Sequence, residues 1–542
     1  MDSDPLLEEL LSQIGDWGKY QYRQHMLHLL GGFLAGLHML SIVAIAPTPS
    51  HRCYIQELDA DVSTPTFNLS ELKPYIPFKD GNYETCKKFD ALTNETIGCE
   101  QFVYDGTYYK ESRVISWNLV CDQRWERAII QAIYIFGVLV GAIVLGPMAD
   151  KYGRKTIFCI SGVLQLFAGL ASAFISYYPL YCTVLFFYGA FASAGSYISG
   201  FCLTMELVGP SKRTICGTLF SLYFALGVMV VAIWGYLIVD ITILQIVYSL
   251  HSLTLFAHWW LIDESVRWLW GQGRTAEAVQ IVKKATEMNG KPFDGKFDGK
   301  IVLPSTEGKS YGIGDLFKKP VLMSRAINVA FNWFANSIVY YGLSLNTGNL
   351  HGNPYLLLFF SGLAEIPGYI LVVCIVDKTG RRSLCSTLML LGGFACIIVA
   401  FISNGTVITT IVMLGKMSIA GSFAIIYNYT AELFPTVVRN SAVGVGAMAA
   451  RFSGMLTPLL SLLDSVDKQL PTVIFGTFAI LSAMLTLFLP ETLNKQMPQT
   501  VEEGEHFGVG DTGYRTFLNF CRGRGTDEPK EVTEKLNVSE SA

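Results

Sequence analysis

The stretch Gly146-Pro147-Met148-Ala149-Asp150-Lys151-Tyr152-Gly153-Arg154-Lys155 connects two long apolar runs with almost no loop between them. A similar stretch, Asp377-Lys378-Thr379-Gly380-Arg381-Arg382, recurs in the second half of the chain. Two further motifs recur in the same order and at the same interval to within one residue: Thr204-x-Glu206-Leu207 with Arg213 returns as Thr430-x-Glu432-Leu433 with Arg439, and Glu264 returns as Glu491. Three recurrences in one order indicate two homologous halves.

The composition indicates that both halves are membrane bundles. The chain has 542 residues, 51% of them hydrophobic and 15% charged, and its mean hydropathy is +0.39. These values disfavour a single soluble domain. About twelve apolar runs are long enough to cross a bilayer at about 20 residues per crossing: 26–46, 128–148, 156–175, 181–203, 215–237, 241–262, 326–343, 354–376, 384–402, 407–427, 441–463 and 471–489. We therefore expect an all-α membrane protein with twelve transmembrane helices in two six-helix pseudo-repeats, and a parallel repeat of this kind places a substrate site between the halves of a transporter.

The charges of the short loops predict the orientation. The loops that carry the repeated motifs are basic, whereas the alternate loops carry almost no Lys or Arg, so the motif loops should face the cytoplasm. Acidic residues among the first 25 exclude a cleaved signal peptide, so the first crossing should be an uncleaved anchor. We expect a multi-pass plasma-membrane protein with both termini in the cytoplasm. Its predicted parts are a cytoplasmic segment (1–25), a six-helix bundle (26–262), a cytoplasmic linker (263–325), a second six-helix bundle (326–489) and a cytoplasmic tail (490–542).

Residues 47–127 should form one long extracellular loop. It holds an even set of cysteines, Cys53, Cys86, Cys99 and Cys121, which allows three pairings into two disulfides in an oxidising compartment. Two glycosylation sequons, at Asn68 and Asn94, lie in the same loop.

Three charged residues, Glu365, Lys416 and Arg451, lie inside apolar runs of the second half. A charge at mid-helix costs roughly 2.5–3.5 kcal/mol on insertion scales, so such residues face either a watery cavity or one another. The first possibility places them in a substrate site. The second makes Glu365, with Lys416 or Arg451, a buried structural network.

Aromatic residues supply a second candidate feature. Trp333, Asn336 and Tyr340 follow an i, i+3, i+7 spacing and so should share one helix face. A Trp/Tyr face toward water suits an ammonium group through cation–π contact, worth about 2 kcal/mol when desolvated. The alternative is packing or interfacial anchoring. Tyr427 is a further, weaker candidate for the same site.

The repeated motifs also carry a family resemblance. Gly146 to Lys155 looks like the signature loop of the major facilitator superfamily, and Asp377 to Arg382 looks like its second copy. Stretches such as Trp117-Asn118-Leu119-Val120-Cys121 and Ala431-Glu432-Leu433-Phe434-Pro435-Thr436 are similar to the organic cation, carnitine and organic anion transporter family, with the second half most similar to insect organic cation transporters and to the carnitine branch. One departure is Asp263-Glu264-Ser265-Val266-Arg267, where the family usually has Pro-Glu-Ser-Pro-Arg.

The resemblance implies a cytoplasmic gate whose ion pairs hold the two halves together when the cavity opens outward. By this resemblance the gate would contain Gly146, Asp150, Gly153, Arg154, Glu206, Arg213, Glu264, Arg267, Asp377, Gly380, Arg381, Glu432 and Arg439. In the family the aromatics that match Trp333 and Tyr340 line the substrate pocket. The position that matches Arg451 tends to be acidic in the cation-selective branch and basic in the anion and carnitine branches.

Together these features predict a secondary transporter of small organic cations or zwitterions, such as carnitine, betaine or related amines, by alternating access. Sodium ions or protons are possible coupling ions. An organic anion exchanger is the alternative within the same class, and a ligand sensor that does not transport is the alternative outside it. The sequence has no nucleophile–base set, phosphate loop or metal-ligand spacing, so we expect no enzyme activity, cofactor or metal. A net charge of −4 gives no reason to expect nucleic acid as a partner.

Overall fold

The computed structural model describes residues 5–60, 65–79, 82–90, 95–294, 313–347, 350, 352–495 and 497–508. In this part of the chain the membrane-crossing segments of the first half are α2 (Lys19–Ile45), α6 (Arg124–Tyr152), α7 (Arg154–Phe174), α8 (Tyr178–Gly189) with the π-helical η2 (Ala190–Ile198) and α9 (Ser199–Leu207), α10 (Arg213–Leu237), and α11 (Ile241–Leu250) with η4 (His251–Ala257) and α12 (His258–Leu261). Those of the second half are α15 (Pro320–Leu345), α16 (Pro354–Thr379), α17 (Arg381–Ala400), α18 (Gly405–Leu433), α19 (Arg439–Ser461) and α20 (Leu470–Thr486).

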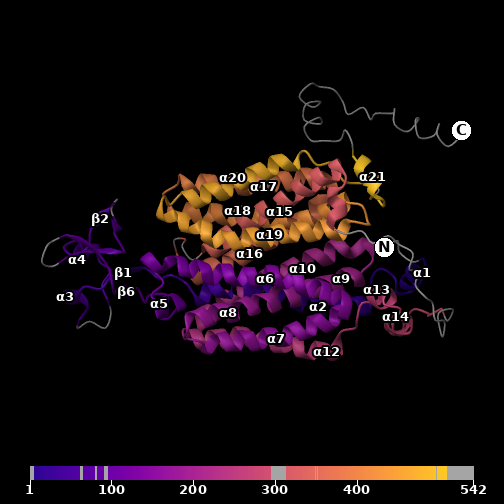
Figure 1. Ribbon diagram of the computed structural model, residues 1–542, viewed down its shortest axis with the longest axis horizontal. Coiled ribbons are helices and arrows are strands. Elements are labelled where there is room, and N and C mark those ends of the chain that lie inside the picture. The colour runs from indigo at the N-terminus through magenta and orange to yellow at the C-terminus, as the bar shows by residue number, and fades with distance from the viewer. Residues whose placement is uncertain are drawn as a thin grey trace, which may run out of the picture.

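Ten of these segments are long and apolar enough by composition to cross a membrane. The other two are α15, whose 26 residues include several asparagines, and α20, which has 17 residues. Twelve crossings in two groups of six confirm the predicted fold class. Figure 1 shows the two groups as separate bodies, the second half lying alongside the first.

Two helices begin before the apolar runs from which the sequence predicts their crossings. Helix α2 begins at Lys19 rather than near residue 26, because the hydroxyl of Tyr20 and the amide of Gln24 donate to Asp263 at 3.0 and 3.1 Å. Helix α15 begins at Pro320 rather than near 326, because its first free N–H groups donate to the carboxylate of Glu505 at 3.2 Å. In both cases the partner lies far away in sequence.

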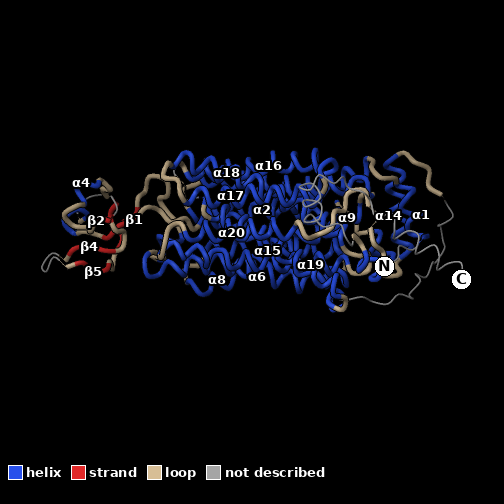
Figure 2. The backbone as a smooth tube through the Cα atoms, turned by 90° about the horizontal axis from the view of Figure 1, so that it is seen from above, coloured by secondary structure: helices blue, strands red, loops and turns tan. Residues whose placement is uncertain are grey.

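The extra-membrane parts lie at opposite ends of the bundle (Figures 1 and 2). At one end, the loop end, three antiparallel pairs join β1 (His51–Cys53) with β6 (Phe102–Tyr104), β2 (Phe78–Lys79) with β3 (Asn82–Tyr83), and β4 (Lys87–Phe89) with β5 (Thr96–Gly98). The helices α3 (Gln56–Asp59), α4 (Leu69–Leu72) and α5 (Arg113–Trp117) and the short η1 (Cys121–Gln123) belong to the same part. At the other end, the motif end, lie α1 (Pro5–Ile14), α13 (Val266–Gly271), α14 (Thr275–Asn289), η6 (Ile313–Phe317) and α21 (Val501–His506).

The motif-end helices pack on one another through a small apolar core. Leu10 of α1, Trp268 of α13 and Val282 of α14 are buried there. Helices α13 and α14 lie in the stretch predicted to be the linker, whereas residues 295–312 of that stretch lie outside the described part.

Helices pack closely on one another within the first half and also between the two halves. Within the first half α2 and α10 cross so closely that a Cβ at Gly36 would collide with the carbonyl oxygen of Phe224. Between the halves, α10 packs on α16 and α6 packs on α19. The site described below lies between these two contacts.

Candidate functional site

The first repeated motif forms a tight turn between α6 and α7 at the motif end. Gly153 has φ +105°, a conformation that favours glycine, and a Cβ there would collide with the carboxylate of Glu264. That carboxylate accepts hydrogen bonds from the backbone N–H groups of Arg154 and Lys155, each at 3.1 Å, and so caps the N-terminus of α7. Burial raises the pKa of the Glu264 carboxyl above its usual range, although the backbone donors oppose this.

Arg154 connects this turn to the rest of the first half. Its guanidinium lies 2.8 Å from the carboxylate of Asp150 and 3.3 Å from that of Glu206, and its side chain is only 16% exposed. The indole N–H of Trp268 donates to the carbonyl oxygen of Asp150 at 2.7 Å. We call the group Asp150, Arg154, Glu206 and Glu264 the first latch.

The second half repeats this arrangement with the same residue types and the same kinds of contact. Gly380 has φ +85°, and the carboxylate of Glu491 accepts from the backbone N–H of Arg381 at 2.8 Å. The guanidinium of Arg381 lies 3.0 Å from Asp377 and 3.0 Å from Glu432. These residues form the second latch. The spatial repeat matches the repeat read from the sequence.

Both latches lie within their own halves, which differs from the expectation that their ion pairs hold the halves together. The reason is geometric. Each arginine starts the helix after the turn, so it reaches the aspartate four residues earlier and a glutamate on a neighbouring helix of its own bundle.

The remaining predicted gate residues belong to neither latch. Arg267 pairs with Glu8 of α1 at 2.7 Å. Arg213 and Arg439, from opposite halves, are close enough to repel one another. A Cβ at Gly146 would meet nothing within 4 Å, so no close contact requires a glycine there.

At the loop end, polar contacts do join the two halves. The guanidinium of Arg124 on α6 forms an ion pair with Asp464 and donates to the carbonyl oxygen of Leu462 at 2.9 Å. The hydroxyl of Tyr355 on α16 donates to the carbonyl oxygen of Tyr108 in the 47–127 loop at 3.3 Å. A cavity of about 1320 Å³ lies here, lined by the loop and by both bundles.

A central chamber of about 110 Å³ lies between the halves. Most of its lining is aromatic, small or hydroxyl-bearing, and both halves contribute: Ala35, Met39, Val138, Ser193, Tyr197, Ser221 and Phe224 from the first, and Trp333, Ser337, Tyr340, Tyr341, Tyr369, Phe423, Ala424, Tyr427, Ala447, Ala450 and Arg451 from the second. Ser193 and Tyr197 lie in the π-helical η2, an irregularity that often occurs at functional sites.

Contacts between the halves border the chamber on both sides. Toward the loop end, the hydroxyl of Tyr341 lies 3.3 Å from the sulfur of Met39. Toward the motif end, the rings of Phe201 and Tyr427 have centroids 5.8 Å apart.

Arg451 is the one ionised side chain among the described residues that line this chamber. Its guanidinium donates to the carbonyl oxygen of Ala447, one turn earlier, at 2.9 Å. Within the described ranges no carboxylate forms an ion pair with it. The chamber therefore presents a positive charge to whatever enters.

Four of the seven predicted substrate residues line the chamber: Trp333, Tyr340, Tyr427 and Arg451. The rings of Trp333 and Tyr427 meet edge to face with centroids 4.2 Å apart, and the Trp333 N–H donates to the hydroxyl of Thr430 at 3.0 Å. Asn336 lies outside the lining, buried, with its amide donating to the carbonyl oxygen of Asn332 at 3.1 Å. Three residues turn a helix by about 300°, which directs Asn336 to the side of the face that Trp333 and Tyr340 share.

Glu365 and Lys416 also lie outside the lining, which corrects the expectation that they face the cavity. They form an ion pair of 3.2 Å, and both side chains are at most 1% exposed. The hydroxyls of Tyr340 and Tyr369 donate to Glu365 at 2.7 and 2.9 Å, and Lys416 donates to Ser344 at 2.8 Å. The structural-network alternative therefore describes this pair.

Sequence reasoning missed every chamber residue of the first half. Met39, Tyr197, Ser221 and Phe224 are apolar or hydroxyl residues within apolar runs, where they look like packing residues. Only the repeat itself, which predicts a site shared by both halves, pointed to the first half at all.

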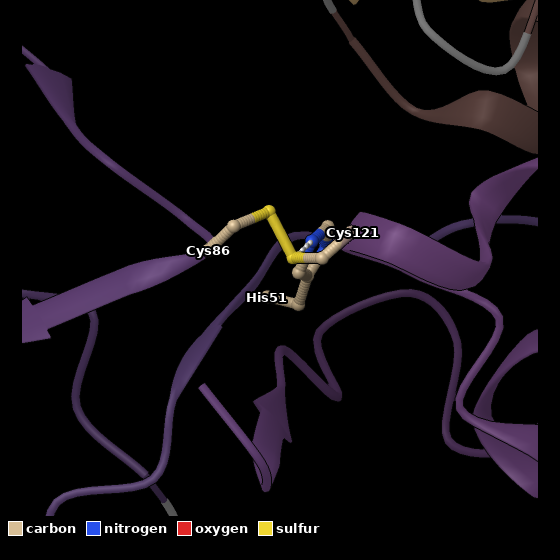
Figure 3. Close-up of side chains that lie close together, drawn as sticks. All are labelled: His51, Cys86 and Cys121. Carbon is tan, nitrogen blue, oxygen red and sulfur yellow. Dashed lines mark hydrogen bonds between the residues drawn. A yellow bond between two sulfur atoms is a disulfide. The ribbon is translucent and has the colours of Figure 1, made fainter. Parts of the chain in front are cut away.

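In the 47–127 loop, Cys53 pairs with Cys99 and Cys86 pairs with Cys121. His51 lies beside the second bond (Figure 3), and burial lowers the pKa of its imidazole. The sulfurs of Cys86 and Cys121 are bonded to each other, so this group offers a metal ion only one imidazole. Asn68 is exposed at the start of α4, whereas Asn94 lies outside the described residues.

Comparison with known proteins gives consistent matches over most of the chain. The family described as "Sugar (and other) transporter" matches residues 84–502. The chain is 34% identical to "Organic cation transporter protein" of Drosophila melanogaster, over 92% of this chain and 95% of that protein. It is 31% identical to "Organic cation/carnitine transporter 2" of Homo sapiens, over 92% and 93% of the two chains.

Solved structures support the same assignment at the level of fold. The proton:xylose symporter XylE of the major facilitator superfamily, bound to 6-bromo-6-deoxy-D-glucose, superposes with a TM-score of 0.58 and 16% identity, covering 90% of this chain and 99% of that one. The inward-open xylose transporter XylE from E. coli gives a TM-score of 0.57 at 15% identity, covering 90% and 100% of the two chains. The doubled latch and the chamber between two six-helix bodies agree with these relatives. The chain therefore belongs to the sugar (and other) transporter family of the major facilitator superfamily, in the branch of the organic cation and carnitine transporters, and it is a multi-pass membrane transporter rather than an enzyme.

Proposed function

We propose that the protein moves a small zwitterion, with an amine at one end and a carboxylate at the other, across the plasma membrane by alternating access. The observation that carries this proposal is Arg451, a cation without a carboxylate partner among the described residues, in an otherwise aromatic and hydroxyl-lined chamber between the halves. Both termini would face the cytoplasm, because α1 and α21 lie at the end of the bundle that holds the basic motif loops.

Arg451 suits the carboxylate end of such a substrate. Its guanidinium can bind a carboxylate through two parallel hydrogen bonds. Hydrogen bonds to charged groups contribute about 1.5–3 kcal/mol. Ser221 also lines the chamber and could offer its hydroxyl, whereas the hydroxyls of Ser193 and Ser337 already bond with Tyr134 and with the carbonyl oxygen of Ala450.

The aromatic lining suits the amine end. Trp333, Tyr341 and Tyr427 supply aromatic rings whose faces would attract a quaternary or protonated amine, at about 2 kcal/mol for a desolvated cation–π contact. Glu365 is not available for this role, because Lys416 and two tyrosine hydroxyls already hold its carboxylate. Because the chamber is basic, a carrier of this kind would have to bind the amine of a zwitterion by aromatic rings rather than by an acidic side chain.

Two sets of contacts support alternating access. The ion pair of Arg124 with Asp464 and the bond from Tyr355 to Tyr108 join the halves at the loop end and would part when the chamber opens there. The two latches keep each half rigid at the motif end, so each half can rock as one body. Sodium ions or protons are candidates for the coupling ion.

A second candidate function is organic anion exchange. It is favoured by the same arginine and by the lack of an acidic side chain among the described residues of the lining. An anion would use Arg451 fully, but its negative charge would gain nothing from the electron-rich faces of the aromatic rings.

Uptake of radiolabelled carnitine, tetraethylammonium and para-aminohippurate into cells that express the protein separates these functions. We expect carnitine to be taken up best, with Arg451→Ala reducing its uptake about tenfold or more, as expected for a lost charged hydrogen bond of at least 1.4 kcal/mol. Best uptake of para-aminohippurate would support the anion exchanger instead. No uptake of any of the three, with normal surface expression, would contradict carriage of these substrate classes and favour the ligand-sensor alternative.

A further inference from the structure

The cavity of about 1320 Å³ at the loop end, which we call the vestibule, adjoins the central chamber along two helices. On α15, Tyr341 lines the chamber, and the next residue, Gly342, lines the vestibule. On α6, Gln131 lines the vestibule, and Val138 lines the chamber. The helical stretch from 131 to 138 is about 10 Å long, so a solute that enters at the loop end passes the vestibule before it reaches the chamber.

One face of α6 forms part of the vestibule wall. Arg124, Arg127, Ala128 and Gln131 all line the vestibule, and their spacing of i, i+3, i+4 and i+7 is that of a single helix face. Arg124 is engaged by its ion pair with Asp464 of the second half. Arg127 and Gln131, four residues apart, are direct neighbours on this face.

Arg127 is a half-buried cation without an acidic partner. Its Nε donates to the carbonyl oxygen of Ala46 at 3.2 Å, and its two terminal nitrogens form no hydrogen bond within the described part of the chain. Asp464 is near enough to attract it, but no carboxylate of the described residues forms an ion pair with it, and Asp464 is held by Arg124. The guanidinium can therefore accept a ligand.

Gln131 adds an unsatisfied amide beside this cation. Its side chain is 6% exposed, and its buried Nε2 has no hydrogen-bond partner among the residues that the structure describes. Buried polar atoms nearly always have a partner, so this amide requires an explanation. A half-turn of the amide exchanges its nitrogen and its oxygen, which turns the N–H group toward the cavity that the side chain lines.

The other charges of the vestibule lining are engaged or exposed. Lys87 forms an ion pair of 3.2 Å with Glu84. Asp105 accepts two hydrogen bonds within its own turn, at 2.9 and 2.5 Å. Asp122 and Lys468 are exposed to solvent.

We propose that Arg127 and Gln131 form an outer binding site for the carboxylate of an incoming substrate. The guanidinium would donate two parallel hydrogen bonds to the carboxylate, and the amide would donate a third. A water molecule could also bond to Gln131, but only an anion would pair with the charge of Arg127 as well. This inference deepens the proposed carriage of a zwitterion and rests on it.

The outer site would act before the chamber. At the loop-end border of the chamber, the hydroxyl of Tyr341 lies 3.3 Å from the sulfur of Met39 and joins the halves. A substrate bound at Arg127 would stay in the vestibule until this contact opens, and its carboxylate would then move to Arg451. The two arginines would thus bind the same group of the substrate in succession.

The test measures binding in the vestibule without transport. Ala128→Cys places a thiol between Arg127 and Gln131, and a membrane-impermeant methanethiosulfonate reagent labels it on intact cells. The same protein carries Arg451→Ala, so that binding in the chamber contributes little. We expect carnitine and para-aminohippurate, which carry a carboxylate, to slow the labelling, and tetraethylammonium, which carries none, to leave its rate unchanged. Equal protection by tetraethylammonium, or no protection by either carboxylate, would overturn the proposal.

Matched variants locate the site. Arg127→Ala should raise the carnitine concentration that halves the labelling rate at least tenfold, as the loss of a charged hydrogen bond of 1.4 kcal/mol or more would do. Gln131→Glu should also raise it, because an acid repels a carboxylate, and this variant serves if Arg127→Ala fails to fold. Arg127→Lys keeps the charge and should raise it much less.

Lys468→Ala is the control, because it removes an exposed cation from the same cavity. We expect this control to leave the protecting concentration unchanged. A shift as large as that of Arg127→Ala would show that the overall charge of the cavity attracts the anion, which would overturn the site. Each concentration is a ratio within one variant, so the charge of the reagent cancels.

Protection and uptake are separate readouts. Uptake of carnitine by the wild type, with no protection of the thiol at position 128, would overturn the outer site and leave the proposed carrier function standing. Protection without uptake would support the outer site and contradict carriage. The absence of both would overturn both.

Discussion

The ammonium group of Lys416 lies 3.2 Å from the carboxylate of Glu365, and neither side chain reaches the surface of the central chamber. Two charges that the sequence places inside apolar runs therefore neutralise each other within the second half. Arg451 is left as the charge that a substrate meets. This division decides how the chamber can discriminate between cations, zwitterions and anions.

Breaking the buried pair should destabilise the protein rather than change its selectivity. Glu365→Gln or Lys416→Met alone leaves one buried charge without its partner, at a cost of about 3–5 kcal/mol. Thermal unfolding of the purified protein in detergent should show a lower Tm for either variant. The double variant should recover much of the loss, because it removes both charges. Single variants as stable as the wild type would show that the pair is solvated.

The first latch should be required for transport. Asp150→Asn or Arg154→Ala removes an ion pair that fixes the turn between α6 and α7. We expect uptake to be abolished while surface expression stays near normal. Lys151→Ala, the neighbouring cation in the same turn, is the matched control and should transport normally. Wild-type rates in both latch variants would refute this role.

The two disulfides should stabilise the 47–127 loop without being required for the helix bundles. Removing the Cys86–Cys121 bond as a pair of serines should cost about 2–5 kcal/mol of local stability. Limited proteolysis of intact cells should then cleave the loop faster. Cys374→Ser, at an exposed free cysteine, is the control and should leave the cleavage rate unchanged. Equal cleavage rates in the double-serine variant and the wild type would contradict the prediction.

The fold could be predicted because its signals are long and repeated. Twelve apolar runs and three duplicated motifs can be recognised from residue types alone, without knowledge of how the side chains pack. The starts of α2 and α15 could not be predicted, because they depend on partners far along the chain, Asp263 and Glu505.

The candidate site could be predicted only where a residue type is unusual for its surroundings. Arg451 and Trp333 stand out within an apolar run, and the structure places both in the chamber lining. Phe224 and Ser221 do not stand out, although they line the same chamber. Whether a charge in a run faces a cavity or a partner depends on the neighbouring helix, so Glu365 could not be told from Arg451 by sequence alone.

The central claim is that Arg451 binds the carboxylate of a zwitterionic substrate. The most direct measurement is the ratio of carnitine uptake to tetraethylammonium uptake in Arg451→Asp, with Arg451→Lys as the control that keeps the charge. The account predicts that this ratio falls at least tenfold in Arg451→Asp, since an acid would repel a carboxylate and attract a simple cation, and that it falls much less in Arg451→Lys. An unchanged ratio in Arg451→Asp, with both variants present at the cell surface, would contradict it.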